Sequence, residues 1–128
     1  DVEIIALAWD VLRKLGIKEL NLEINTLGDV SDRLNFQKSF LEWLEINKNS
    51  LDLDSQNRIT KNPLRILDSK SMQTKKALEN APRLFNFLSE KSHKRYSDFK
   101  KQLEVLKIPY VENFNLVRGL DYYTHTAF

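Results

Sequence analysis

The residues best suited to chemistry lie in one short segment near the carboxyl end of the chain. Residues 116–123 have the sequence LVRGLDYY. The guanidinium of Arg118 can form paired hydrogen bonds with a carboxylate or a phosphate, and it does not deprotonate. Tyr122 and Tyr123 each offer a ring face for stacking and a hydroxyl for hydrogen bonding. The segment therefore has the groups needed to hold an anion and to contact a ring.

Structural roles compete with this interpretation of the segment. Arg118 could pair with Asp121 or Glu112 to stabilise the fold. Two adjacent tyrosines in a strand usually divide between the core and the surface, because successive side chains point to opposite faces. Both could touch one ligand only where the backbone departs from a regular strand, and Gly119 would allow such a bulge.

The composition excludes several other kinds of site. The chain has 128 residues and no cysteine, which rules out disulfide frameworks, thiol nucleophiles, zinc fingers and iron–sulfur clusters. Its three glycines are scattered, so no Gly-rich phosphate loop is present. His93 and His125 are the only histidines and are far apart in sequence, so we predict no metal site.

The formal charge of +2 conceals segments of opposite sign. Residues 1–57 carry 6 basic and 11 acidic side chains, residues 58–107 carry 13 and 5, and residues 108–128 carry 1 and 2. A surplus of eight positive charges in the middle segment is typical of a surface that binds a polyanion. A solvated helical surface rich in lysine would have the same composition, so both interpretations stay open.

The chain is long enough to bury a core without disulfides or a structural metal. It has no apolar run near the roughly 20 residues that a bilayer crossing needs, and its first residues lack the basic start of a signal peptide. We therefore expect a soluble cytoplasmic protein with no membrane partner.

The hydrophobic periodicity predicts a mainly helical chain with strands near both ends. We expect helices over 1–15, 29–47 and around 96–106, a short helix that begins at Asp52 or Asp54 and ends at Ile59, and a short helical turn at 72–78. We also expect helical segments at 64–67 and from Pro82, extended chain at 108–111, a strand over 20–26 and one or two strands over 116–128. Strands that flank a helical block indicate an α+β fold, in which a helical module is inserted between strands of one sheet. One strand at each end is few for an independent sheet, so we expect a fragment of a larger protein.

Three segments resemble the histidyl-tRNA synthetases, a family of class II aminoacyl-tRNA synthetases. The segment LVRGLDYY, followed by Thr126 and Phe128, is similar to the signature motif of that family. The segments INTLGD at 24–29 and NPLRILDSK at 62–70 resemble two further stretches, in the same order and with the same spacing. The Ala81-Pro82 pair also lies where the family usually has it.

The resemblance implies an internal fragment of the catalytic domain. Residues 1–28 would belong to the catalytic core, residues 29–107 would form the helical insertion on the tRNA acceptor-arm side, and residues 108–128 would be catalytic strands with the signature motif. The strands would be part of the antiparallel sheet of a class II synthetase. The parent would activate histidine with ATP to histidyl-adenylate and transfer it to tRNA(His), whereas the fragment alone would be inactive.

The resemblance also implies roles for individual residues. Arg118 would be catalytic and bind histidine, together with Tyr122 and Tyr123. ATP would be a substrate with Mg2+, and the parent would be a homodimer. The candidate contacts with the tRNA acceptor arm are basic residues of the insertion: Lys75, Lys76, Arg83, Lys91, Lys94, Arg95, Lys100 and Lys101.

Two other functions remain open at this point. One is a non-catalytic paralogue of the type found as a regulatory subunit of ATP phosphoribosyltransferase. The intact Arg118-to-Tyr123 run argues against it, because such paralogues usually diverge in this motif. The other is a helical RNA-binding module whose flanking strands are structural remnants.

Overall fold

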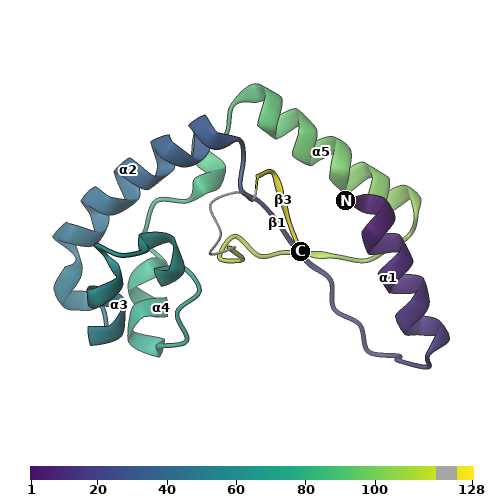
Figure 1. The fold of residues 1–128 in the computed structure, drawn as a ribbon, viewed down its shortest axis with the longest axis horizontal. Coiled ribbons are helices and arrows are strands. Elements are labelled where there is room, and N and C mark those ends of the chain that lie inside the picture. Colours follow the sequence, from purple (N-terminus) through teal and green to yellow (C-terminus); the bar gives the residue numbers. More distant parts are fainter. Residues whose placement is uncertain (118–123) are drawn as a thin grey trace.

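The computed structural model describes residues 1–117 and 124–128. Strands lie in the middle of the molecule, with the longest helix and a group of short helices on one side and the remaining helices on the other (Figure 1). The α-helices are α1 (Val2–Lys14), α2 (Val30–Ile46), α3 (Leu53–Arg58), α4 (Met72–Leu78) and α5 (Glu90–Val105). Single 3-10 turns are η1 (Lys48–Ser50), η2 (Pro63–Ile66) and η3 (Leu84–Phe87). The strands are β1 (Glu23–Thr26), β2 (Val111–Glu112) and β3 (Thr126–Ala127).

The three strands form a small mixed sheet with β1 in the centre. β2 pairs with β1 in parallel, with Glu23 opposite Val111. β3 pairs with β1 in the antiparallel sense, with Asn25 opposite Ala127. The predicted α+β class with mainly helical content is confirmed, but the sheet of the described residues is mixed, whereas we expected it to be antiparallel. The parallel pair arises because the chain returns to β2 through α5, which runs back along the sheet.

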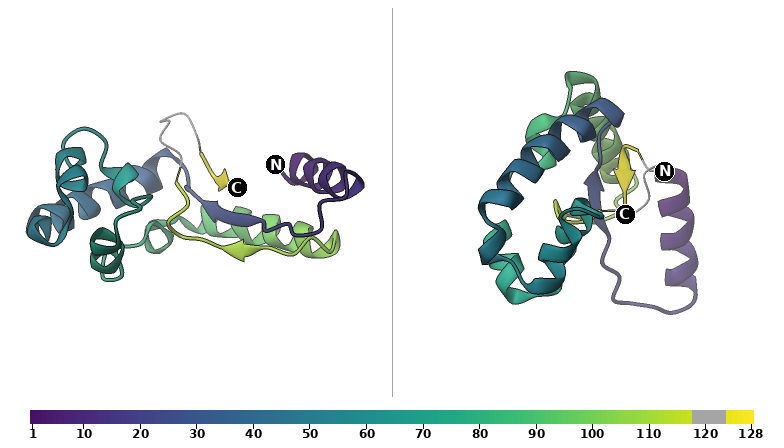
Figure 2. Two further views of the ribbon diagram at one scale, coloured as in Figure 1. Left: turned by 90° about the horizontal axis from the view of Figure 1, so that it is seen from below. Right: turned by 60° about the vertical axis from the view of Figure 1, so that its left-hand side comes forward.

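One apolar cluster joins α1, α5 and β1 (Figure 2). Its buried members are Ile5 of α1, Ile24 of β1, Tyr96, Phe99 and Leu103 of α5, and Ile108. The spacing of Tyr96, Phe99 and Leu103 places them on one face of α5, because residues three and four apart lie on the same side of a helix. This face covers one side of the sheet and leaves the basic side chains of α5 other than Lys100 exposed to solvent.

A second apolar cluster fills the helical lobe, by which we mean residues 30–88. Phe36 and Phe40 of α2 stack at 5.2 Å between ring centroids, and Leu44 continues the same face. The lobe's short helices pack against this face through Leu51, Ile59, Ile66, Leu67, Leu78 and Leu84. The predicted division placed 29–107 in one module, whereas the apolar residues of α5 pack with α1 and β1. That division therefore stays a prediction about the complete protein.

The helix predicted from Pro82 forms only the short turn η3. Its apolar residues serve two different clusters, since Leu84 and Phe87 pack in the helical lobe while Phe85 packs beside α5. A regular helix could not supply both sites. Ser89 then begins α5 as its N-cap, accepting a hydrogen bond from the backbone N–H of Ser92 at 3.3 Å.

The helical lobe is held together by a network around Asp52. Asp52 caps α3 by accepting the backbone N–H groups of Asp54 and Ser55. It also accepts the hydroxyl of Thr74 from α4, at 2.5 Å. These bonds matter because helices of six and seven residues are unstable by themselves. Hydrogen bonds from Ser55 and Thr74 lower the pKa of Asp52 to about 2.

The start of α2 is joined to the start of α5 by Asp32. Asp29 and Asp32 form a capping box, in which each side chain accepts the other's backbone N–H. The same Asp32 carboxylate, 3% exposed, accepts the backbone N–H of Ser89 at 2.8 Å and the hydroxyl of Ser92. Burial alone would raise the pKa of Asp32, but the hydrogen bonds from Ser92, Asp29 and Ser89 hold it below its usual value. This carboxylate therefore connects the two clusters.

Gly28 makes this connection possible. Its φ of +61° lies in the region that glycine adopts most readily, and a Cβ there would lie 2.7 Å from Asp32 and 2.8 Å from Leu88. The chain can turn from β1 into α2 at this point only without a side chain.

Within the described part of the chain, no helix is long and apolar enough to cross a membrane.

Replacement of Gly28 should separate close packing from backbone strain. We expect Gly28→Ala to lower the free energy of unfolding by about 3 kcal/mol, because strain and a displaced Asp32 act together. Gly16→Ala is the matched control. Gly16 also has a positive φ, +86°, but nothing lies within 4 Å of the position that a Cβ would occupy, so the cost should be about 1 kcal/mol. Urea unfolding of both variants gives the difference, and equal losses would contradict the role assigned to Asp32.

Candidate functional site

The predicted catalytic and histidine-binding residues lie in a segment that the structure does not describe, although it describes the chain on both sides of that segment. Arg118, Tyr122 and Tyr123 fall within 118–123, outside the described residues. Their roles stay predictions. The structure does describe the chain that leads into this segment, through Val117, and the chain that leaves it, from Thr124. The surroundings of the candidate site are therefore built from these two ends.

The entry to the segment is held by the side chain of Asn25. The Nδ2 atom of Asn25 donates to the backbone carbonyl of Leu116 at 2.9 Å and to that of Phe114 at 3.3 Å. Leu116 and Val117 then pack against the apolar cluster of the helical lobe. Both a polar and an apolar interaction thus fix the chain immediately before Arg118.

The exit from the segment is held by backbone pairing with β1 and the two residues that follow it. The N–H of His125 donates to the carbonyl of Gly28 at 2.7 Å, and the N–H of Leu27 donates to the carbonyl of His125. β3 continues the pairing, with Thr126 opposite Thr26 and Ala127 opposite Asn25, and lies beside β1 in Figure 1. Residues 25–28 therefore hold both ends of the signature motif.

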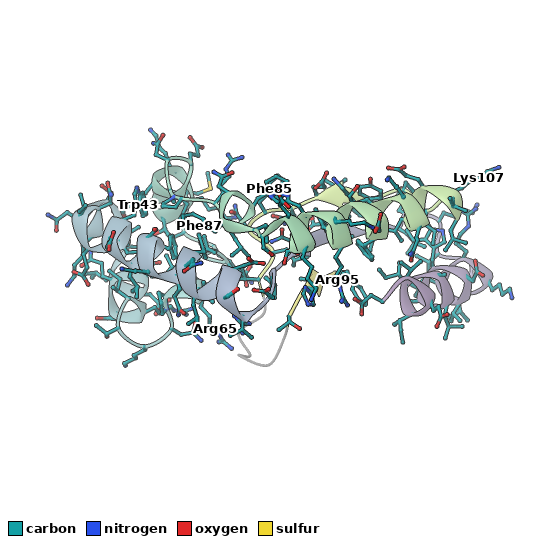
Figure 3. The ribbon with its side chains drawn as sticks, turned by 90° about the horizontal axis from the view of Figure 1, so that it is seen from above. Trp43, Arg65, Phe85, Phe87, Arg95 and Lys107 are labelled. Carbon is teal, nitrogen blue, oxygen red and sulfur yellow. The ribbon has the colours of Figure 1, made fainter. Side chains whose placement is uncertain are left out.

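His125 lies where the exit strand meets α2 and α5. Its backbone has a φ of +62°, and its Nδ1 is buried with no hydrogen-bond partner among the described residues. Burial lowers the pKa of His125, as do the positive charges of Arg95 and Lys91, while Asp29 opposes them. Figure 3 shows the Arg95 side chain extending from α5 toward β3. The basic face of α5 thus reaches the exit of the signature motif.

The structure divides the eight candidate tRNA contacts into two groups. Lys75 and Lys76 lie on α4 and Arg83 precedes η3, so these three belong to the helical lobe. The other five lie on α5, where Lys91, Lys94 and Arg95 line a groove of about 450 Å³ that also includes Thr126 of β3. The first group thus lies on the helical lobe, and the second lies on α5, which packs in the apolar cluster with α1 and β1.

Some of these basic side chains already have partners within the chain. Lys100 pairs with Glu112 at 3.0 Å, and its ammonium lies 5.0 Å from the centre of the Tyr96 ring. Lys94 pairs with Asp98 at 2.6 Å on the surface of α5. Arg83 stacks near Phe114, with 5.9 Å between the guanidinium carbon and the ring centre. Lys100 is half-buried, whereas the other seven side chains are exposed.

Metal-ligating side chains do not gather in the described part of the chain. Over residues 1–117 and 124–128, no group of three histidine, aspartate or glutamate side chains could hold a metal ion.

Comparison with known proteins shows what the chain is similar to. No family model matches the chain. Along its full length it is 88% identical to the histidine–tRNA ligase of Prochlorococcus marinus strain AS9601 and 54% identical to that of Synechococcus sp. strain RCC307. It is also similar to the crystal structure of apo S. aureus histidyl-tRNA synthetase, with 37% identity and a TM-score of 0.72 over 98% of the chain. The chain is homologous to a part of the histidyl-tRNA synthetases.

The predicted resemblance to the histidyl-tRNA synthetases is thus confirmed. The chain spans about 30% of the length of the two curated relatives and 29% of the S. aureus structure. The activity of a complete synthetase is therefore a proposal for this chain.

Two residues that bond to the chain on either side of 118–123 were not predicted from the sequence. Asn25 alternates with the buried Ile24, so the pattern placed it on the open face of a strand. It is 3% exposed because the chain at 113–117 covers that face. His125 carries no local signal for its positive φ or for the pairing of its backbone with Leu27 and Gly28.

The lowered pKa of His125 predicts a pH-dependent stability. An unfolded chain binds a proton near pH 6.5, whereas the folded chain does so only at lower pH. The contribution of His125 to stability should be fully present well above pH 6.5 and should be lost as the pH falls below that value, because the unfolded chain then binds a proton that the folded chain does not yet bind. His125→Asn should reduce this fall, because asparagine tolerates the positive φ and does not titrate. Unfolding at several pH values tests this, with His93 unchanged in both proteins, and an identical fall in the variant would contradict it.

Proposed function

We propose that the chain is part of a histidine–tRNA ligase that activates histidine with ATP and transfers it to tRNA(His). The observation that carries this proposal is the 88% identity to a curated histidine–tRNA ligase along the whole chain, with the signature residues Arg118, Tyr122 and Tyr123 in place. The same observation argues against a non-catalytic paralogue, because the curated relatives compared above are ligases.

Arg118 is the catalytic group in this proposal. A carboxylate oxygen of histidine attacks the α-phosphorus of ATP, and the bond from that phosphorus to the pyrophosphate oxygen breaks. Negative charge builds on the α-phosphate as pyrophosphate leaves. A guanidinium that contacts both the carboxylate and the α-phosphate aligns them and stabilises this charge. Tyr122 and Tyr123 contact the imidazole by stacking and hydrogen bonding.

The rest of the ligase completes the reaction. Mg2+ enters with ATP as part of the substrate. The chain spans about 30% of its relatives, so we expect the isolated 128 residues to be inactive. The complete enzyme is proposed to act in the cytoplasm as a homodimer.

The acceptor arm of tRNA is the proposed polyanion. Lys75, Lys76 and Arg83 are exposed on the helical lobe, and Lys91, Arg95 and Lys101 are exposed on α5, which reaches the exit of the signature motif. Phosphates of an RNA that contacts both groups would pass the strands that hold the motif. This arrangement supports delivery of the tRNA end to the site of histidine activation.

The catalytic proposal can be tested in a chimeric ligase. We define this chimera as the P. marinus AS9601 enzyme in which the 128 residues replace their 88% identical counterpart. Arg118→Ala should lower histidine-dependent ATP–pyrophosphate exchange by about 100-fold or more, because the charge that develops on the α-phosphate loses its partner. Arg58→Ala is the control, since Arg58 forms an exposed surface ion pair with Asp54. A chimera with Arg118→Ala that exchanges pyrophosphate at the unsubstituted rate would sink the assignment.

The RNA proposal predicts a change in salt dependence. The triple variant Lys75→Gln, Lys76→Gln, Arg83→Gln of the chimera should bind tRNA(His) more weakly. Its slope of log affinity against log salt should be shallower by about 0.9 for each duplex phosphate that the variant no longer neutralises. Lys100→Gln should change little, because Glu112 already neutralises Lys100. Filter binding at several salt concentrations measures both, and an unchanged slope in the triple variant would rule out the helical lobe as the binding surface.

A further inference from the structure

One face of α1 carries large apolar side chains that the described residues leave exposed. We call this face the outer stripe, and it consists of Ile4, Leu7 and Val11 of α1 and Leu15, which follows the helix. The exposed fractions of these four residues are 61%, 65%, 46% and 72%. Their spacing of three and four residues places them in one row along the helix. Such a row in water loses the stabilisation that burial of aliphatic side chains would give.

The opposite face of α1 is already used by the fold. Ile5 is 3% exposed, and Val2, Ala6 and Trp9 pack beside it in the apolar cluster with α5 and β1. Each residue advances about 100° around a helix, so Leu7 and Trp9 face nearly opposite ways. The outer stripe is therefore a second apolar face of α1 and does not continue the first.

Charged side chains take up little of the surface of α1. Three of its four charged residues, Glu3, Asp10 and Lys14, are spaced by seven and four residues, so they form one row along the helix. All three are exposed. A helix at a protein surface usually has one apolar face, whereas a helix that is apolar on opposite sides is usually covered on both. The pattern of α1 is thus typical of a helix that meets solvent mainly along its charged row.

The size of the outer stripe favours a covering surface within the same polypeptide. From Ile4 to Leu15 the stripe is about 16 Å long and about 10 Å wide. This area is far smaller than the roughly 800 Å² that each partner buries in a standard stable interface, so a second copy docked on the stripe alone would bind weakly. A surface of the same chain needs no association from solution, because the covalent link gives it a high effective concentration.

The length of the relatives shows that such chain exists in a ligase. The 128 residues span about 30% of the two curated histidine–tRNA ligases, so most of a ligase's chain lies outside them. The outer stripe contains no basic side chain, so it offers no partner for the phosphates of RNA. An apolar surface of the remaining ligase chain therefore fits the stripe better than either a second copy or RNA.

We propose that the outer stripe packs against an apolar surface of the ligase chain outside these 128 residues, within one polypeptide. This inference rests on the proposed ligase function. The inner face of α1 packs with α5 and β1, and its outer face would pack with the rest of the enzyme. α1 would thus join α5, which bears five of the candidate tRNA contacts, to the remainder of the ligase.

Thiol labelling of the folded chimeric ligase tests the proposal. Leu7→Cys and Val11→Cys each place a thiol in the outer stripe, and Lys14→Cys is the matched control in the charged row of the same helix. The 128 residues contain no cysteine, so mass spectrometry of the α1 peptides detects each new thiol separately. We expect a maleimide to label the two stripe variants about 100-fold or more slowly than Lys14→Cys, because a covered thiol reacts only when the structure opens locally.

The outcomes separate the possible covering surfaces. Labelling of Leu7→Cys and Val11→Cys within about threefold of Lys14→Cys would overturn the proposal. Protection that is lost on dilution would also overturn it in favour of a second copy, and protection that appears only with tRNA(His) would overturn it in favour of RNA. Loss of folding in Leu7→Cys beside a folded Lys14→Cys would support it, because substitution of an exposed residue changes stability little.

Failure of the proposed ligase function has a different signature. An unsubstituted chimera that folds but lacks histidine-dependent ATP–pyrophosphate exchange would count against that function. The labelling ratio between the outer stripe and the charged row reports on the covering of α1 alone, so the two failures can be told apart.

Discussion

The buried carboxylate of Asp32 is the interaction on which the rest of the structure depends. It accepts hydrogen bonds from the start of α2 and from the start of α5, and so links the two apolar clusters. A buried charge is stable only where such donors surround it. Gly28 allows the carboxylate to approach the chain, because any side chain there would occupy the same space. The turn from β1 into α2 and the junction of the two apolar clusters therefore depend on the same two residues, Gly28 and Asp32.

This junction lies next to the residues that hold the signature motif. β1 ends at Thr26, and the following Leu27 and Gly28 pair with the exit strand before the chain turns at Asp29 into α2. The entry to the motif is bound by Asn25 on the same strand. Residues 25–32 thus connect the helical lobe, α5 and the chain on both sides of 118–123.

Charge is distributed according to the same layout. The positive surplus of residues 58–107 is divided between the helical lobe and α5, and the sheet between them holds the ends of the motif. The ammonium of Lys100 already pairs with Glu112 and lies over the Tyr96 ring, so its charge stabilises the fold. Arg95 and Lys91 instead act on His125 at the exit of the motif. Basic residues of the same helix, α5, therefore make different interactions, depending on which residues pack beside them.

Local sequence determined most of the helices, their caps and the family. The periodicity of Phe36, Phe40 and Leu44, the cap at Asp29 and the motif at 116–123 are readable without a fold, because they depend on neighbours a few residues away. Tertiary structure decided the parallel pairing of β2, the shortening of the helix after Pro82 to η3, the packing of α5 against α1, and the burial of Asn25 and of the Nδ1 atom of His125. Each of these depends on segments that meet across large sequence separations, as Asn25 meets Leu116. Alternation along one strand predicts which way a side chain points but cannot predict what will cover it.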